Sequence, residues 1–89
     1  MRYTVIWKPP AEQELADLWM NAEDRNVITD AADQIDDLLR REPEEIGESR
    51  TGPIRRMFVP PLGVAFEVRE ADRLVLVLSV WRFRIGKHR

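Results

Sequence analysis

Basic side chains suited to binding phosphate gather in the C-terminal half of the chain. Residues 50–89 carry nine basic residues against three acidic ones, a net charge of +6, whereas residues 1–49 carry five against thirteen, a net charge of −8. Twelve of the fourteen basic residues are arginine, whose planar guanidinium matches phosphate or carboxylate with paired hydrogen bonds. The pattern favours a nucleic acid or an acidic protein as partner, but neutralisation of one half by the other within the fold explains the charges equally well.

The geometry of a strand should bring several of these cations together. Arg82 and Arg84 are two residues apart at the end of the apolar run Leu74–Trp81, so their side chains point to the same face of a strand. Arg50 lies in a loop that we expect to approach the end of this strand. We therefore expect one concave anion-binding surface, lined by Arg50, Arg55 or Arg56, Arg82 and Arg84, with Lys87 as a further candidate.

The elements that carry these residues form an antiparallel meander in our prediction. Three short apolar runs between Ile54 and Arg84 are separated by Pro60-Pro61 with Gly63, and by the polar stretch 69–73, which are turn signals. Within Leu74–Trp81 the single polar residue is Ser79. A strand without polar alternation is typical of an inner position, with neighbours on both sides.

The N-terminal half predicts a strand followed by two helices. Residues Arg2–Lys8 alternate in polarity, which indicates a half-buried strand. A proline in the first helical turn, and apolar residues spaced three and four apart, predict two helices: from Pro10 to about Ala22 and from about Asp24 to Arg41. Residues 41–53 are predicted to form a loop. Burial is expected for eight apolar residues: Trp7, Leu15, Trp19, Ile35, Leu38, Phe66, Leu76 and Leu78.

This order of elements predicts one α+β domain over residues 1–89. Its β-α-α-β-β-β arrangement packs a helical hairpin on one face of a mainly antiparallel four-stranded sheet. A chain of 89 residues has a modest core. We expect that a protein partner adds to its stability.

Several classes of function are excluded by residue type. The chain has no cysteine, so it forms neither a disulfide nor a thiolate site. It has no Gly-rich phosphate loop, Ser-His-Asp set, HExxH motif or dinucleotide fingerprint, and we expect neither a cofactor nor a metal. Its apolar runs fall short of the ~20 residues of a membrane span, so we expect a cytoplasmic protein without a membrane partner.

The strand and helix order, together with KPPAEQELADLW at the helical hairpin and IRRMF, PPLGVAFEV and LVLVLSVWRFR in the sheet, resembles the RelE/ParE toxins of type II toxin–antitoxin systems. The resemblance implies a RelE-like fold and a cognate antitoxin. It further implies growth arrest through one of two targets. We take ribosome-dependent cleavage of mRNA by a metal-independent endoribonuclease, an mRNA interferase, as the first expectation. A non-enzymatic inhibitor of DNA gyrase, like ParE, and a toxin that has lost its activity are the alternatives.

For an mRNA interferase, the resemblance also implies roles for individual residues. Arg56, Arg82, Arg84 and His88 would surround the scissile phosphate, with His88 as the acid in place of a terminal tyrosine that some members have. Glu48 or Glu67 would take the proton if a base is needed. One arginine of the cleaving members falls at Gly63, which has no side chain to hold phosphate. Further RNA contacts would come from Arg50, Arg55, Lys87 and Arg89.

Overall fold

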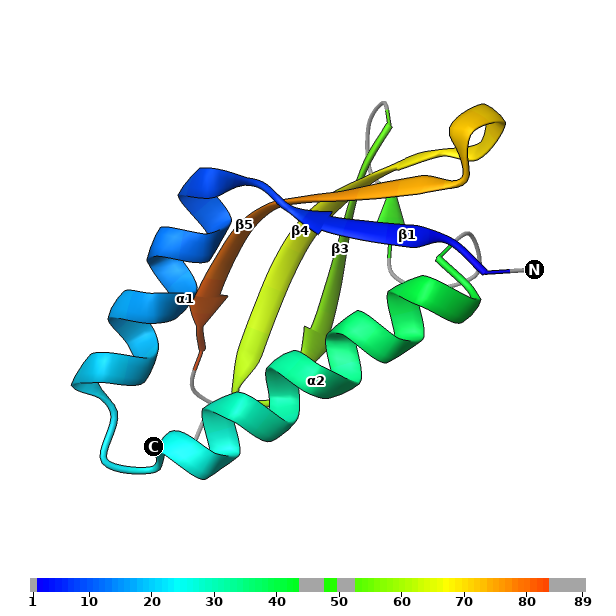
Figure 1. Cartoon of the computed structure of the whole chain (residues 1–89). Coiled ribbons are helices and arrows are strands. Elements are labelled where there is room, and N and C mark those ends of the chain that lie inside the picture. Colours follow the sequence, from blue (N-terminus) through cyan, green and yellow to red (C-terminus); the bar gives the residue numbers. More distant parts are fainter. Residues whose placement is uncertain (1, 44–47, 50–52, 84–89) are drawn as a thin grey trace.

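Two helices cover one face of a twisted sheet in the computed structural model, which describes residues 2–43, 48–49 and 53–83 (Figure 1). Strand β1 (Thr4–Trp7) leads into helix α1 (Pro9–Asn21), whose first positions are prolines; proline is tolerated there because the first helical N–H groups have no partner within the helix. Helix α2 (Arg25–Arg41) follows after a short connection. Both helices lie within a few residues of their predicted bounds.

Helix α2 is an amphipathic helix whose polar face carries ion pairs four residues apart. Arg40 pairs with Asp36 and Arg41 with Asp37, both at 2.7 Å. Arginines in the last turn also offset the partial negative charge of the helix C-terminus. The acidic residues of this helix therefore belong largely to a solvated face.

The sheet has the strand order β1-β5-β4-β3-β2. Its remaining strands are β2 (Glu48–Ser49), β3 (Ile54–Val59), β4 (Leu62–Arg69) and β5 (Leu74–Arg82). Strand β1 is parallel to β5, and the other pairs are antiparallel. The predicted α+β fold is confirmed, with one correction: β2 lies in the predicted loop, because the free edge of β3 is available for pairing with its two residues.

Strand β5 is an inner strand, as predicted, but only along part of its length. Strand β1 pairs with Leu74–Val77, and beyond this point the backbone N–H of Val80 donates to the Oε1 atom of Glu14 on α1 at 2.9 Å. A bulge also interrupts the pairing with β4, since Ala65 pairs with Ser79 while the next residue, Phe66, pairs with Val77. The bulge leaves Leu78 without a partner on β4.

The core lies between the helices and the sheet. Its fully buried large side chains include Ile28, Ile35, Leu39 and Phe66. Of the eight residues expected to be buried, Ile35, Phe66 and Leu76 are buried, and Trp7, Leu15, Leu38 and Leu78 are half-buried. The prediction is wrong for Trp19, whose side chain is 41% exposed, because it lies at the edge of the helical layer. Neither helix is long and apolar enough to cross a membrane, over the residues that the structure describes.

Candidate functional site

Strand pairing divides the side chains of the sheet between two faces. Residues that lie opposite each other on neighbouring strands share a face. Val64 pairs with Met57 and with Val80, and all three are in the core beneath the helices; we call this side the helix face. The other side, which we call the open face, carries alternate residues of each strand, among them Ile6, Ile54, Arg56, Phe58, Gly63, Ala65, Glu67, Ser79 and Trp81.

Arg82 lies at the end of β5 on the helix face, where it pairs with Leu62. Its guanidinium donates two hydrogen bonds to the carboxylate of Asp24, at 3.0 and 2.9 Å. These bonds lower the pKa of Asp24 and raise the pKa of Arg82, because each charged form is stabilised by the other. Binding of a phosphate by Arg82 would therefore compete with Asp24.

The two arginines of β3 point in opposite directions. Arg55 pairs with Phe66 on the helix face and is half-buried, whereas Arg56 pairs with Ala65 on the open face and is exposed. Arg56 and Arg82 thus lie on opposite faces of the sheet. The structure does not bring them together, so the expected surface is corrected for its Arg56 alternative. Arg55, the other alternative, lies on the same face of the sheet as Arg82. Residue parity within one strand did not show which face each strand would present to the helices.

Gly63 lies on the open face directly under the indole of Trp81. A Cβ atom at this position would be 2.7 Å from the Cε2 and Nε1 atoms of Trp81, which is closer than van der Waals contact allows. The ring of Phe58 meets that of Trp81 edge-on, with centroids 6.1 Å apart, and meets Phe83 in the same way at 5.2 Å. The resemblance to RNA-cleaving toxins implies an arginine at position 63, but here the indole of Trp81 fills the space that its side chain would need.

Glu67, a candidate proton acceptor, shares the open face with Arg56. Its Oε2 atom accepts a hydrogen bond from Nε of Arg69 at 3.2 Å. It lies opposite Ile54, whereas Arg56 lies opposite Ala65, so Glu67 and Arg56 are diagonal neighbours. Among the described residues, no three side chains of the types His, Cys, Asp and Glu form a cluster that could hold a metal ion.

Five of the predicted site residues lie outside the described residues: Arg50, Arg84, Lys87, His88 and Arg89. Their roles stay predictions. Of the residues that the structure describes, Arg55, Arg56 and Arg82 occupy the positions given above.

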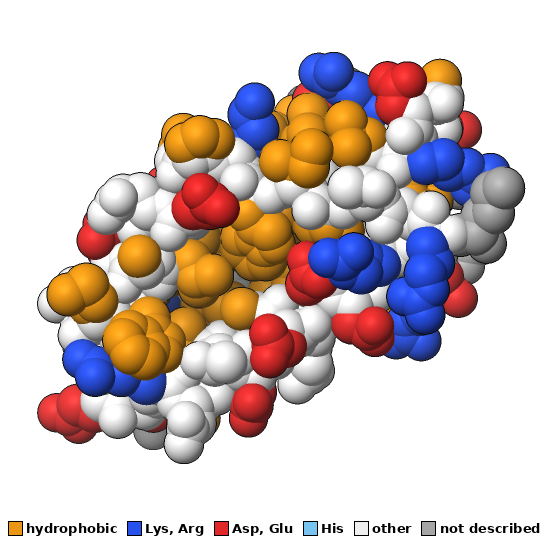
Figure 2. All heavy atoms as spheres, in the orientation of Figure 1, with side chains coloured by type: hydrophobic (Ala, Val, Ile, Leu, Met, Phe, Trp, Pro, Cys, Tyr) orange, Lys and Arg blue, Asp and Glu red, His pale blue; other side chains and the backbone are white. Residues whose placement is uncertain are grey.

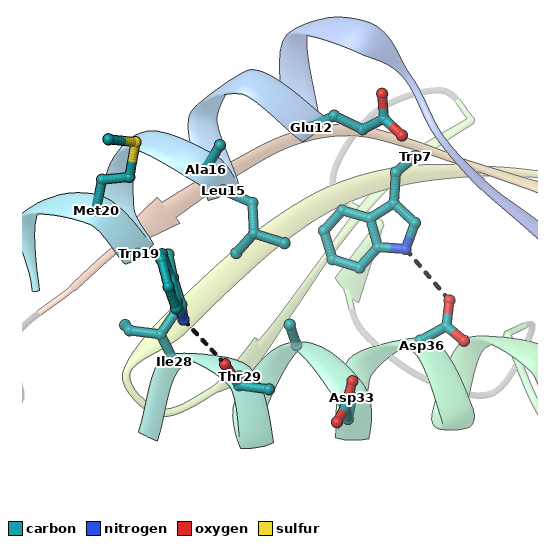
Figure 3. Close-up of a pocket in the computed structure, with 11 residues that line it drawn as sticks. Trp7, Glu12, Leu15, Ala16, Trp19, Met20, Ile28, Thr29, Asp33 and Asp36 are labelled. Carbon is teal, nitrogen blue, oxygen red and sulfur yellow. Dashed lines mark hydrogen bonds between the residues drawn. The ribbon is translucent and has the colours of Figure 1, made fainter. Parts of the chain in front are cut away.

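A second feature, which we did not predict from the sequence, is a groove between α1 and α2. Figure 2 shows apolar side chains gathered in a hollow between the helices, with carboxylates beside it. The groove has a volume of about 690 Å³ and is lined from both helices and from Trp7. Two indoles reach α2 across it (Figure 3): Trp7 donates to Asp36 and Trp19 to Thr29, both at 3.2 Å. The sequence contains one signal of this surface: Trp19 and Met20 are adjacent large apolar residues, and one amphipathic stripe of a helix cannot bury both. In the structure both are exposed.

The comparisons with known proteins agree on the fold. A sequence model described as the ParE toxin of type II toxin-antitoxin system, parDE, matches residues 5–89. No curated protein sequence is similar enough to match the chain. A chain of the toxin–antitoxin complex RelBE2 from Mycobacterium tuberculosis is 18% identical with a TM-score of 0.75, and the alignment covers 94% of this chain and 100% of that chain.

Two further solved structures share this arrangement of strands and helices. A chain of the chromosomal ParDE system from P. aeruginosa is 15% identical with a TM-score of 0.74, covering 92% of this chain and 97% of that chain. The isolated RelE toxin from E. coli is 16% identical with a TM-score of 0.68, covering 96% and 88%. At such low identities the likeness shows a common fold and not a common activity.

Proposed function

The chain belongs to the ParE toxin family of type II toxin–antitoxin systems, and from this premise we propose that it arrests growth by binding DNA gyrase rather than by cleaving mRNA. Its partners are then gyrase and a cognate antitoxin that inhibits it. The relatives RelBE2 and ParDE were solved as toxin–antitoxin systems, which supports the antitoxin as partner. Such an activity requires the chain to act in the cytoplasm.

The observation that carries this proposal is the separation of Arg56 from Arg82. Cleavage of RNA needs cations that converge on one phosphate, together with groups that move protons. Arg82 is paired with Asp24 on the helix face, Arg56 is on the open face, and the indole of Trp81 leaves no room for a side chain at Gly63. Arg56 is therefore not placed to share one phosphate with Arg82.

Inhibition by contact needs no catalytic set, and the open face offers suitable contact residues. Phe58 is 54% exposed, and Arg56, two residues earlier on the same face of β3, is exposed as well. Aromatic residues and arginine are enriched among the residues that dominate protein–protein binding. We assign this part of the open face as the contact surface for gyrase.

The test is a supercoiling assay with purified gyrase and the full chain. We expect dose-dependent inhibition of supercoiling, and intact mRNA when the same preparation is added to translating ribosomes. The substitutions Arg56→Ala and Phe58→Ala should each weaken inhibition, while Asp30→Asn, a change on the exposed side of α2, should not. Cleaved mRNA together with unaffected supercoiling would refute the proposal.

Cleavage of mRNA is the second candidate, and the uncovered aromatic cluster next to Arg56 favours it. Exposed aromatic rings stack on bases and arginine binds phosphate, so Phe58 and Arg56 could hold a single strand. In this activity Arg56, Arg82, Arg84 and His88 are the catalytic candidates, and Arg50, Arg55, Lys87 and Arg89 contact RNA. Single changes of Arg56, Arg82 and Arg84 to Ala in a toxic background test these roles, with growth arrest and mRNA cleavage on translating ribosomes both measured. If all three variants keep full toxicity, none of these arginines takes part in the activity.

A further inference from the structure

Three residues form a row across the open face, one on each of three neighbouring strands. Phe58 of β3 pairs with Gly63 of β4, and Gly63 pairs with Trp81 of β5. Side chains of residues that lie opposite each other on neighbouring strands are within reach of one another. Since Gly63 has no side chain, the two aromatic residues meet above it.

The indole of Trp81 is placed in this row by the glycine beneath it. Its Cε2 and Nε1 atoms lie where they would be 2.7 Å from a Cβ atom on Gly63, and its Cζ2 atom would be 2.8 Å away. The ring therefore occupies the space that a side chain of β4 would fill, close to the backbone of that strand.

The backbone on either side of Trp81 is held by carboxylates from the helical layer. Its two neighbours in β5, Val80 and Arg82, face the helices while Trp81 faces the other way. The backbone N–H of Val80 donates to Glu14 of α1 at 2.9 Å. The guanidinium of Arg82 donates two hydrogen bonds to Asp24. The segment of β5 that carries the indole is thus held from behind at both adjacent residues.

Phe58 is in contact with two other aromatic rings and is nevertheless exposed. Its ring meets that of Trp81 at a centroid distance of 6.1 Å and an interplanar angle of 77°, and that of Phe83 at 5.2 Å and 82°. Both are edge-on arrangements that aromatic pairs prefer. Yet Phe58 is 54% exposed, the most of any aromatic residue in the described chain. Its ring is therefore oriented before any partner arrives.

Such an orientation matters for binding, because a partner must otherwise immobilise the side chains that it contacts. Each side chain that loses its freedom makes association less favourable, and a group that is already held in its bound orientation avoids this loss. Arg56 lies two residues before Phe58 on the same face of β3 and is exposed as well. A partner that meets the oriented ring therefore also reaches this guanidinium.

We propose that Trp81 is a positioning residue for the inhibition of gyrase: it holds Phe58 in the orientation in which Phe58 contacts gyrase. The inference rests on the proposed function, because it takes gyrase as the partner of the open face. It goes further by assigning a role to Trp81, and to Gly63 beneath it, that does not require either of them to touch gyrase.

The first measurement uses the full chain alone. We expect the ring protons of Phe58 to have shifted NMR resonances, because they lie beside two further aromatic rings. Trp81→Leu should move these resonances towards those of a solvent-exposed phenylalanine. Asp30→Asn, on the exposed side of α2, is the control and should leave them in place. Since Trp81 is only half-buried, circular dichroism should show an intact fold in both variants.

The second measurement is the affinity for purified gyrase of four chains: the unchanged chain, Trp81→Leu, Phe58→Ala and the double variant. Trp81→Leu alone should weaken binding about two- to tenfold, the range expected from one edge-on aromatic pair. In the Phe58→Ala background it should weaken binding little further, because no ring is left to orient. If Trp81 acted by direct contact or through stability, the factor would be the same in both backgrounds.

Two further variants separate the presence of the indole from its placement. Trp81→Phe keeps an aromatic ring beside Phe58 and should restore most of the affinity that Trp81→Leu loses. Gly63→Ala keeps every ring but displaces the indole, so it should weaken binding as Trp81→Leu does. If Trp81→Leu fails to fold, these two variants decide: equal affinities of both with the unchanged chain would refute the positioning role.

The outcomes for Trp81 and for gyrase are distinguishable. Three results overturn the positioning role: unchanged resonances of Phe58 in Trp81→Leu, unchanged affinity of that variant, or equal factors in the two backgrounds. No binding of gyrase by the unchanged chain overturns the proposed function, and with it the role of this orientation in inhibition. The resonances of Phe58 then show separately whether Trp81 orients the ring.

Discussion

Arg82 donates both ends of its guanidinium to the carboxylate of Asp24, a residue 58 positions earlier in the chain. Asp24 immediately precedes α2, and Arg82 is the last residue of β5. The pair therefore ties the connection between the two helices to the end of an inner strand. From the sequence alone, Arg82 is a free cation at the end of a strand. In the folded chain it forms a contact between the sheet and the helical layer.

The first prediction concerns the pH dependence of stability. Hydrogen bonds from Arg82 lower the pKa of Asp24 in the folded chain, so the pair contributes its full stability above the unfolded pKa of about 3.9. This contribution is lost as the pH falls through the lower folded pKa. We expect Asp24→Asn to have a lower melting temperature than the unchanged chain at pH 7, and the difference to shrink below about pH 4.

Thermal unfolding followed by circular dichroism from neutral to acidic pH checks this. Asp30→Asn serves as control, because Asp30 is an exposed aspartate of α2, the helix that Asp24 precedes. Combining Asp24→Asn with Arg82→Gln should cost less than the sum of the single changes, as for residues in direct contact. Strictly additive effects would show that the pair does not hold the layers together.

The cation positions illustrate what the sequence could and could not predict about the site. Because Arg55 and Arg56 are adjacent, alternation along a strand places them on opposite faces of β3. It could not show that Arg82 would meet Asp24, because that contact depends on where the connection between the helices comes to lie. It also could not show that Arg56 and Arg82 would face opposite ways, since this follows from the register of β3, β4 and β5.

The second prediction concerns Gly63. Adding one methyl group places a Cβ atom 2.7 Å from the indole of Trp81, so we expect Gly63→Ala to destabilise the fold by about 1–3 kcal/mol, the usual cost of overpacking. The ring must move, and the fluorescence of Trp81 should change. In a Trp81→Ala background the same substitution should cost much less. Equal costs in the two backgrounds would contradict the steric explanation.

The third prediction compares the two indole N–H groups that reach α2. Trp7→Phe removes a half-buried bond to the carboxylate of Asp36, and Trp19→Phe removes an exposed bond to the hydroxyl of Thr29. Bonds to charged groups contribute about 1.5–3 kcal/mol against about 0.5–1.5 for neutral ones, and Asp36 keeps the ion pair with Arg40 in either variant. Urea unfolding should therefore show the larger loss for Trp7→Phe. The reverse order would show that the exposed indole at Trp19 holds the helices together.

The helices and strands were predictable because their apolar spacing is regular, whereas burial at the edges of the layers was not. Pro10 and the apolar residues of α2 locate both helices, and the long apolar run locates β5. Trp19 fits the same helical spacing as Leu15, yet it is exposed, because it lies at the edge of the helical layer. Periodicity shows which side of a helix is apolar, but not how near the neighbouring helix lies.

The last prediction compares one substitution at two phenylalanines on opposite faces of the sheet. Phe66 is fully buried on the helix face, and Phe58 is 54% exposed on the open face. Phe66→Ala leaves a cavity and should cost about 3–5 kcal/mol, a large share of the roughly 4–13 kcal/mol expected for 89 residues. Phe58→Ala loses little burial and two edge-on ring contacts, with Trp81 and Phe83, and should cost about 1 kcal/mol. Urea unfolding gives both losses in the free energy of unfolding, provided that the dependence of this free energy on urea concentration is the same in all variants. Equal losses would mean that the open face is covered in the folded chain.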